Sequence, residues 1–175
     1  MGNKNTDQAH KDTKRTAILV AVSAALCFAF IFAFFLGRVL PVPVDVSGAK
    51  AGSSSVRCRL DAQAPVHKLG GLYFPVSGWA AAEGREIRIQ YCSVLLHNAS
   101  TGAYYRLNTC PQQRADAYRA DGDDHGHENG GFHALVANGA LEEGALYRVC
   151  LLYRNDGENA LIETDLIIRK QHREG

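Results

Sequence analysis

The sequence predicts an all-β domain, a seven-stranded antiparallel sandwich, preceded by one N-terminal transmembrane helix. Two observations support this fold class. Residues 16–36 contain no charged residue, no proline and no glycine. From Val56 onward, short apolar runs alternate with polar positions and are separated by Gly, Asn, Asp and Ser, which is typical of β-strands joined by turns.

The apolar run is long enough to cross a membrane. At about 1.5 Å per residue, a helix over these 21 residues covers about 30 Å, the thickness of the hydrocarbon core of a bilayer. Pro41 and Pro43 then stop the helix. We therefore expect a signal-anchor helix over residues 16–40.

Basic residues around this helix predict its orientation. More of them precede the apolar run than follow it, and such an excess keeps the adjoining segment in the cytoplasm. Residues 1–15 are thus predicted to be a cytoplasmic tail, and the C-terminal domain is predicted to be extracytoplasmic. The basic residues are Lys4, Lys11, Lys14 and Arg15 before the run, and Arg38 and Lys50 after it.

A cleaved signal peptide is the alternative to an anchor. Ala49, Lys50 and Ala51 form a small-residue site of the type that signal peptidases cut. Such peptides have an apolar core of about 7 to 15 residues with the cleavage site close behind it. Here the core is longer and the site lies well downstream, so an uncleaved anchor is the favoured interpretation.

Residues 41–55 are predicted to be a stalk between helix and domain. Pro41 and Pro43 favour an extended chain, and the Gly- and Ser-rich stretch from Ser47 to Ser55 is flexible. This segment would be a tether that leaves the angle of the domain unfixed.

Seven segments have the short alternating pattern of strands, as Tyr147, Val149, Leu151 and Tyr153 illustrate. Residues 98–102 and 155–157 carry turn chemistry and are predicted hairpin loops. The domain is predicted over residues 56–170, with a C-terminal tail over residues 171–175. The predicted strands are 56–60, 72–80, 87–97, 103–110, 132–137, 145–154 and 161–169.

The segment 141–149 has a leucine, a glycine and then Tyr147 at the start of an alternating strand. It resembles the tyrosine corner of immunoglobulin-like and fibronectin type III domains. The resemblance implies an Ig-like sandwich in which the tyrosine hydroxyl ties the loop back to its strand. Trp79 would then be a core aromatic residue.

A wider resemblance covers residues 65–170. It is carried by the segments 76–80, 114–117, 131–134 and 144–147, taken in that order. Together they are similar to the small extracytoplasmic β-sandwich domains attached to bacterial cell-envelope glycosyltransferases and phosphoglycerol transferases. The resemblance implies an accessory module associated with envelope polysaccharide, here without an attached enzyme.

Cysteine usage agrees with an extracytoplasmic domain. Cys27 lies inside the apolar run, and the other four cysteines are spread through the domain without Cys-x-x-Cys or zinc-ligand spacing. Two disulfides are therefore predicted, with the pairing left open, and four free thiols are the alternative. The disulfide candidates are Cys58, Cys92, Cys110 and Cys150.

Charge excludes one class of partner. After residue 40 the chain has 14 Lys and Arg against 16 Asp and Glu, and no basic stripe. Nucleic-acid binding needs a basic surface, so the sequence predicts no nucleic-acid partner.

Carboxylates and imidazoles crowd into residues 121–133, and both are ligands of divalent metals. His125 and Phe132 stand where a calcium loop of the EF-hand type needs carboxylates. Four glycines would also make the ordering of the segment costly. A solvated polar loop is therefore preferred to a calcium or zinc site, and no cofactor is predicted.

Two further sets are candidate ligand-binding or structural residues. Arg114 and Asp116 lie two positions apart, so on a strand they would form a bracing ion pair, or Arg114 would bind a sugar or carboxylate. Tyr104 and Tyr105, with Tyr118, could form an aromatic platform for sugars. More often, adjacent tyrosines put one ring in the core and one outside.

No catalytic motif is present, so the sequence predicts a protein that is not an enzyme. A nucleophilic cysteine with a histidine stays open, because such partners meet only in space. Asn98 starts an Asn-Ala-Ser glycosylation sequon on a predicted hairpin. The favoured function is a membrane-anchored module that binds a glycan or an envelope protein. The alternative is a metal-dependent function of the 121–133 loop.

Overall fold

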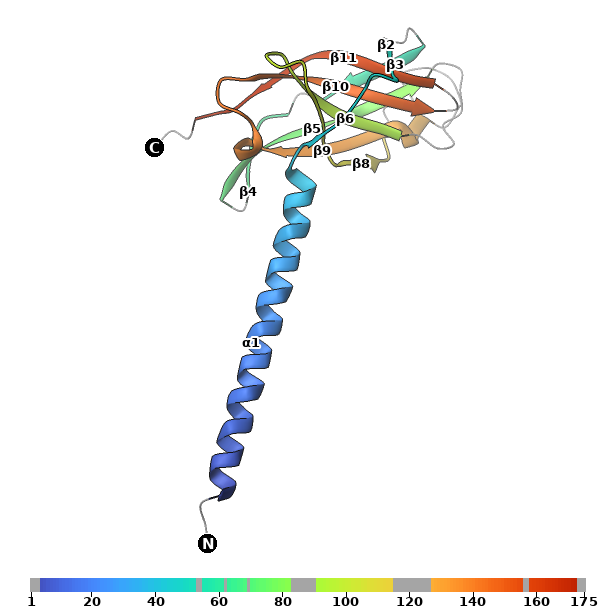
Figure 1. Ribbon diagram of the computed structural model, residues 1–175. Helices are drawn as coiled ribbons and strands as arrows, with labels where there is room; N and C mark the ends of the chain where they lie inside the picture. Colours follow the sequence, from blue (N-terminus) through green and yellow to red (C-terminus); the bar gives the residue numbers. More distant parts are fainter. Residues whose placement is uncertain are drawn as a thin grey trace. The chain divides into compact units, whose positions relative to one another are not determined.

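The computed structural model describes residues 4–52, 55–61, 63–68, 70–82, 91–114, 127–155 and 158–172. The chain divides into two compact units, Met1–Gly37 and Arg38–Gly175, and we call the second unit the head. Figure 1 shows the helical first unit and the mostly β head. The elements are α1 (Lys4–Val39), β1 (Val42–Pro43), β2 (Lys50–Ala51), β3 (Val56–Leu60), β4 (Val66–Lys68), β5 (Gly71–Ala82), β6 (Tyr91–Asn98), β7 (Tyr104–Arg106), β8 (Thr109–Gln112), η1 (His127–Gly130), β9 (Gly131–Ala137), η2 (Asn138–Ala140), β10 (Leu146–Asn155) and β11 (Glu158–Arg169).

Helix α1 exposes large apolar side chains between Ile18 and Phe34. Phe28, for example, is 80% exposed. The part from Lys14 to Val39 is long and apolar enough to cross a membrane, a property that a signal sequence near an N-terminus shares. The predicted apolar helix is thus confirmed. It begins earlier than the predicted residue 16 and ends at Val39, two residues before Pro41.

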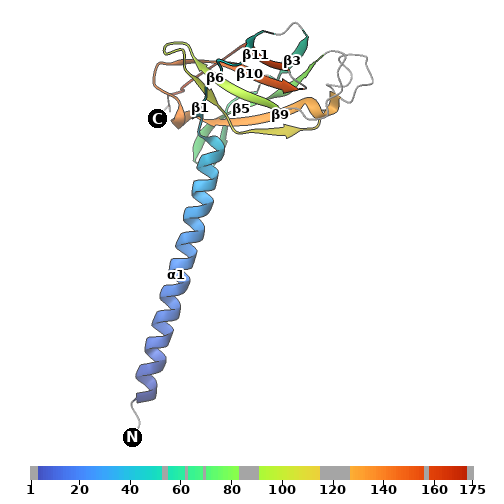
Figure 2. The ribbon, with the colours of Figure 1, turned by 45° about the vertical axis from the view of Figure 1, so that its right-hand side comes forward.

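The head consists of two sheets. The first has the strand order β1-β7-β6-β10-β11-β2, and we call it the six-stranded sheet. The second has the order β3-β5-β9-β8, with β4 added alongside β5, and we call it the five-stranded sheet. All pairs are antiparallel except β11 with β2. Figures 1 and 2 show the two sheets facing each other.

Each of the seven predicted strands overlaps an observed strand, and β3 has the predicted bounds. The predicted segment 103–110 is two strands, because the chain changes sheets at Leu107. There the Leu107 N–H donates to the carbonyl oxygen of Val94, and the Val94 N–H donates to Thr109 Oγ1. The predicted count of seven is too low, because the described residues form eleven strands. Sequence analysis missed the two- and three-residue strands β1, β2 and β4.

The core lies between the two sheets, as the alternation of apolar residues predicts. Val76 of β5, Phe132 of β9, and Val94 and Val149 of the six-stranded sheet are almost completely buried there. These side chains stand on the facing sides of the two sheets, so period-two alternation gives each strand one core face.

Trp79 is not part of this core, contrary to prediction. Its neighbours Gly78 and Ala80 stand on the core side of β5, so Trp79 points to the other face of the sheet. It is nevertheless only 5% exposed and forms a separate small cluster with Ala81. An apolar residue type alone does not tell which face of a strand is covered.

Residues 42–52 differ from the predicted stalk, and we call them the strap. The strap pairs with β7 at one edge of the six-stranded sheet and with β11 at the opposite edge. In between, Val44, Val46 and Ala49 pack on the outer face of this sheet. The proline and glycine content suggested freedom, but the alternating valines supply enough apolar surface to dock the segment.

The strap covers an apolar cluster of its own, which we call the outer cluster. Two hydrogen bonds tie the strap to the sheet. The Val44 N–H donates to the Tyr104 carbonyl oxygen, and the Asn159 side chain donates to the Gly48 carbonyl oxygen. The buried members of the outer cluster are Leu95, Cys150, Leu152 and Leu161. Both faces of the six-stranded sheet therefore carry buried apolar residues.

Candidate functional site

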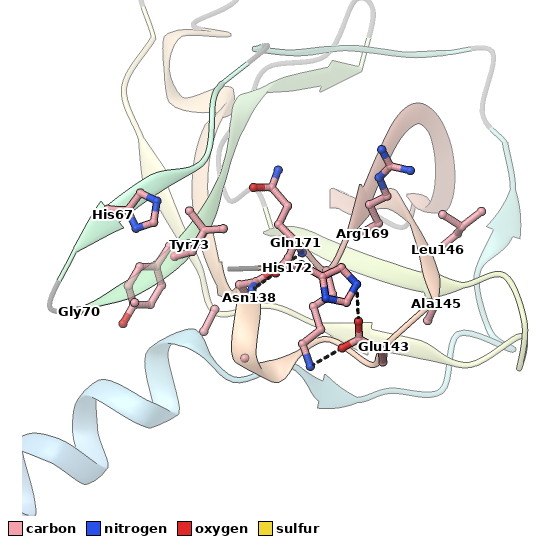
Figure 3. A pocket seen from close by; sticks show the side chains of 16 residues that line it. His67, Gly70, Tyr73, Asn138, Glu143, Ala145, Leu146, Arg169, Gln171 and His172 are labelled. Carbon is pink, nitrogen blue, oxygen red and sulfur yellow. Dashed lines mark hydrogen bonds and ion pairs between the residues drawn. The ribbon is translucent and has the colours of Figure 1, made fainter. Parts of the chain in front are cut away.

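A groove opens at one end of the sandwich, and we call it the end groove. It encloses about 1200 Å³ and is formed by the β4–β5 hairpin, the segment from η2 to the start of β10, and the chain after β11. Figure 3 shows the labelled residues from these three segments arranged around it. Strand ends that meet at one edge of the sandwich place these segments together.

The C-terminal tail forms one wall of the end groove because it is tied to η2. The Asn138 side chain donates to the Gln171 carbonyl oxygen at 2.9 Å, and the Gln171 N–H donates to Asn138 Oδ1 at 2.8 Å. The side-chain amide of Asn138 thus pairs with the tail as another backbone segment would. Residues 171 and 172, predicted to be a tail, have defined contacts in the structure.

Electrostatic contacts hold the same wall. Glu143 pairs with Lys170 Nζ at 3.2 Å and with His172 Nε2 at 2.9 Å, and Figure 3 shows Glu143 facing His172. Arg169 also lines the groove, and no described residue forms an ion pair with it. The cationic side chains of the lining therefore outnumber the single carboxylate.

The turn before β10 positions Glu143. Gly144 has φ of 73°, a left-handed conformation that favours glycine, and the Glu142 N–H donates to the Tyr147 hydroxyl at 3.2 Å. The hydrogen bond that the tyrosine-corner pattern predicted is therefore present. It fixes the turn that places Glu143 in the lining of the groove.

Asn98 is not available for glycosylation in the folded head. Its side chain is completely buried and donates to Glu142 Oε2, while its oxygen accepts from the Ser100 N–H. The sequon therefore serves as the structural start of the hairpin loop.

Arg114 makes a structural brace, but with a partner that the sequence did not suggest. Its guanidinium donates to both carboxylate oxygens of Asp61, at 2.6 and 3.3 Å, and the Ser77 hydroxyl donates to the same carboxylate. Asp116, the expected partner, lies outside the described residues. A guanidinium engaged in this way is occupied rather than open to a sugar.

Tyr104 and Tyr105 point to opposite faces of the six-stranded sheet. Tyr105 packs on the core and makes an edge contact with Tyr147. Tyr104 stacks on His97 with the ring centroids 4.4 Å apart and belongs to the outer cluster. The two rings therefore do not form one platform, and Tyr118 lies outside the described residues.

All five cysteines are free thiols in the structure, so the two predicted disulfides are not formed. Cys58 and Cys92 pack on the core from different sheets, and Cys150 lies in the outer cluster. Cys110 stands directly opposite His133, whose side chain points away from the core, so it lies on the outer face of the five-stranded sheet. Cys110 and Cys150 therefore lie on the outer faces of different sheets and cannot pair with each other, so two disulfides cannot form among the four thiols.

Burial also makes three of these thiols harder to ionise. It raises the pKa of Cys58, and it raises the pKa of Cys92, with a smaller contribution from Cys58 itself. Burial, and then the carboxylate of Glu163, raise the pKa of Cys150 to about 11. Desolvation penalises the thiolate, so these cysteines are poor nucleophiles at neutral pH.

Residues 121–126 of the predicted metal-ligand loop over residues 121–133 lie outside the described residues. His133 is described and belongs to β9. Among the described residues, no group of three or more His, Cys, Asp or Glu side chains could hold a metal ion.

No protein-family model, curated protein or solved structure matches this chain. The chemistry of the end groove is therefore inferred from the residues that line it.

The end groove was missed in sequence analysis because its parts are distant along the chain. Asn138, Glu143 and Gln171 come together only once β9, β10 and β11 are aligned. One signal was present, since the turn that carries Glu143 adjoins the recognised tyrosine pattern. The matching polar residues of the tail had no comparable signal.

Proposed function

We propose that this chain is a single-pass membrane protein whose extracytoplasmic head binds an envelope glycan or an envelope protein in the end groove. The observation that carries the proposal is the end groove itself, a hollow with one wall held by the two Asn138–Gln171 hydrogen bonds and lined by the Glu143–Lys170 ion pair. Ligand sites are typically largely preformed, so a held wall favours binding over a chance gap between loops.

The anchor interpretation is supported by the strap. Lys50 and Ala51 pair with Ala160 and Leu161 of β11, so they are part of the head's sheet. Cleavage at this point would remove the strap and expose the outer cluster. Because these residues complete the sheet of the head, we expect the helix that precedes them to be retained.

The topology supports an immunoglobulin-like or fibronectin III-like sandwich as the fold of the head. The order β3-β5-β9-β8 corresponds to strands A-B-E-D of such domains, and β7-β6-β10-β11 extends the C-F-G sheet by one strand. The hydroxyl of Tyr147 near the start of the F-like strand fits the same scheme. These folds host many unrelated functions, so the function is argued from the groove.

A groove-filling variant tests the proposal. Gly139 lines the groove, and no atom lies within 4 Å of where its Cβ would stand, so Gly139→Trp is expected to place its ring in the hollow. Gly48 is equally open but lies on the strap, so Gly48→Trp is the matched control. The full chain in detergent micelles would be offered envelope polysaccharides and solubilised envelope proteins.

We expect the wild type and Gly48→Trp to retain the same ligand, and Gly139→Trp to lose it. The proposal fails if neither ligand class is retained, or if Gly139→Trp retains the ligand as well as the wild type.

A further inference from the structure

A row of chemically active side chains crosses the outer face of the five-stranded sheet. Ser77 of β5 stands opposite His133 of β9, which in turn stands opposite Cys110 of β8. Directly opposed residues of antiparallel strands share a face, with Cβ atoms about 4.5 to 5.5 Å apart. The hydroxyl of Ser77 donates to Asp61, which extends the row to a fourth strand end.

Cys110 differs from the other head cysteines in its surroundings. Cys58 and Cys92 face the core, and Cys150 is completely buried beneath the strap. Cys58, Cys92 and Cys110 are all half-buried, but only Cys110 packs against none of the buried clusters of the described residues. It is therefore the head thiol whose exposed side lies on an outer face, opposite the imidazole of His133.

A cationic group also contacts this thiol. Arg38, the first residue of the head, donates from Nη2 to Cys110 Sγ. Reactive cysteines occur in partly exposed sites beside Arg, Lys or His, because the thiolate is the nucleophile and a nearby cation favours it. Cys110 accepts a hydrogen bond from a guanidinium and stands opposite an imidazole on the neighbouring strand, which is an environment of this kind.

We propose that Cys110 is a reactive thiol with His133 as its proton acceptor, and that it exchanges with a low-molecular-weight disulfide. His133 takes the proton from Cys110, and the Cys110 sulfur attacks one sulfur of the disulfide. The new bond joins Cys110 to that sulfur, the original S–S bond breaks, and the departing thiolate receives the proton from His133. The sum is thiol plus disulfide giving mixed disulfide plus thiol, with no other oxidant.

This inference is independent of the end groove, because the two sites share no residue. The absence of a disulfide partner within the head follows from the directions of the four thiols. Cys110 is left as the one suited to form a bond with a molecule from outside.

The test measures thiol reactivity in the full chain held in detergent micelles. Oxidised glutathione would be added at pH 7, and the modified cysteine would be identified by peptide mass spectrometry. We expect Cys110 to react at least about tenfold faster than Cys58, Cys92 and Cys150, in line with the effect of an activated environment. Cys110→Ser should remove this fast reaction.

Two histidine variants separate a chemical role from a structural one. His133→Gln should slow the reaction of Cys110 at pH 7 by about tenfold or more, the low end of general-base effects. At a pH of about 10 an ordinary thiol ionises without a base, so Cys110 in the His133→Gln variant should react as fast as in the wild type. His97→Gln, on the other sheet, should match the wild type at both pH values.

Three outcomes would overturn the proposal. The first is that Cys110 reacts no faster than Cys58, Cys92 and Cys150. The second is that His133→Gln leaves its rate at pH 7 unchanged. The third is an equal loss at both pH values, because a misfolded strand pair would slow the reaction regardless of ionisation.

Discussion

Two glycines of the five-stranded sheet are required by close packing rather than by unusual backbone angles. A Cβ atom on Gly78 would meet the backbone carbonyl of Arg59 on β3. One on Gly131 would meet the carbonyl of Gln112 and the side chain of Arg114. Both positions therefore fix how closely neighbouring strands approach, next to the Arg114–Asp61 brace.

Gly78→Ala should destabilise the head. The added methyl group meets backbone atoms that cannot rotate away, so we expect a loss of about 1 to 3 kcal/mol in the free energy of unfolding, as for other overpacked sites. Gly139→Ala is the control, because nothing lies within 4 Å of its Cβ position. Urea unfolding of both variants measures the difference, and equal stability would contradict the packing argument.

Cys150 should make stability depend on alkaline pH. Its pKa is raised from 9.0 to about 11 in the folded head, so the unfolded chain loses this proton first as the pH rises. The stability that the raised pKa of Cys150 contributes is fully present below about pH 9 and is lost by about pH 11. The free energy of unfolding therefore falls across that window.

Urea unfolding at several pH values from about 8 to about 10.5 checks this expectation. Cys150→Ala is the comparison, because it keeps the other ionising groups. The decline in stability should be steeper for the wild type than for the variant. Parallel curves would show that Cys150 ionises alike in both states.

At the scale of elements, alternation of apolar residues predicted most of the sandwich. Long strands such as β5 and β10 carry enough repeats for the period to be clear. Two-residue strands carry no period, so β1 and β2 were invisible, and the strap was taken for a flexible stalk. The change of sheets at Leu107 also leaves no mark in the local pattern.

Residues of the site were less predictable than the strands. The hydrogen bond of Tyr147 followed from a local pattern, because donor and acceptor lie five residues apart. The partner of Arg114 is Asp61, 53 positions away, so nearness in sequence suggested the wrong carboxylate. The pairing of Cys110 with His133 depends on strand register, which the sequence did not specify.

Tyr147→Phe should destabilise the turn that precedes β10. The change removes the hydroxyl that accepts from the Glu142 N–H and should cost about 0.5 to 1.5 kcal/mol of stability, the usual value of one such bond. Tyr105→Phe is the matched control, because its ring makes the edge contact with Tyr147 and no described hydrogen bond involves its hydroxyl. Thermal unfolding of the two variants compares them, and similar losses would refute a special role for the corner.

Val46→Asp should release the strap and uncover Cys150. Val46 packs on the outer cluster, so a carboxylate there is desolvated without a partner and opposes docking. Val42→Asp is the control, because Val42 is half exposed and lies outside that cluster. Alkylation of Cys150 should become faster only in Val46→Asp, and protection in both variants would argue for a different cover.

On the scale of the whole molecule, the two units lead to separate expectations. The apolar helix should hold the full chain in membranes during carbonate extraction, and residues 38–175 alone should be soluble and folded. A membrane-impermeant reagent added to intact cells should label Lys170 of the head but not Lys4 or Lys11. Labelling of the N-terminal lysines instead would reverse the proposed orientation.

The pairing of Lys50 and Ala51 with β11 has a consequence for biosynthesis. Their partner strand is made roughly 110 residues later, which at ribosomal rates is on the order of ten seconds. During that interval Ala49, Lys50 and Ala51 are unpaired and accessible to a signal peptidase. Once β11 pairs with the strap, the peptide bond after Ala51 would lie inside a sheet, so we expect any cleavage there to occur before that pairing.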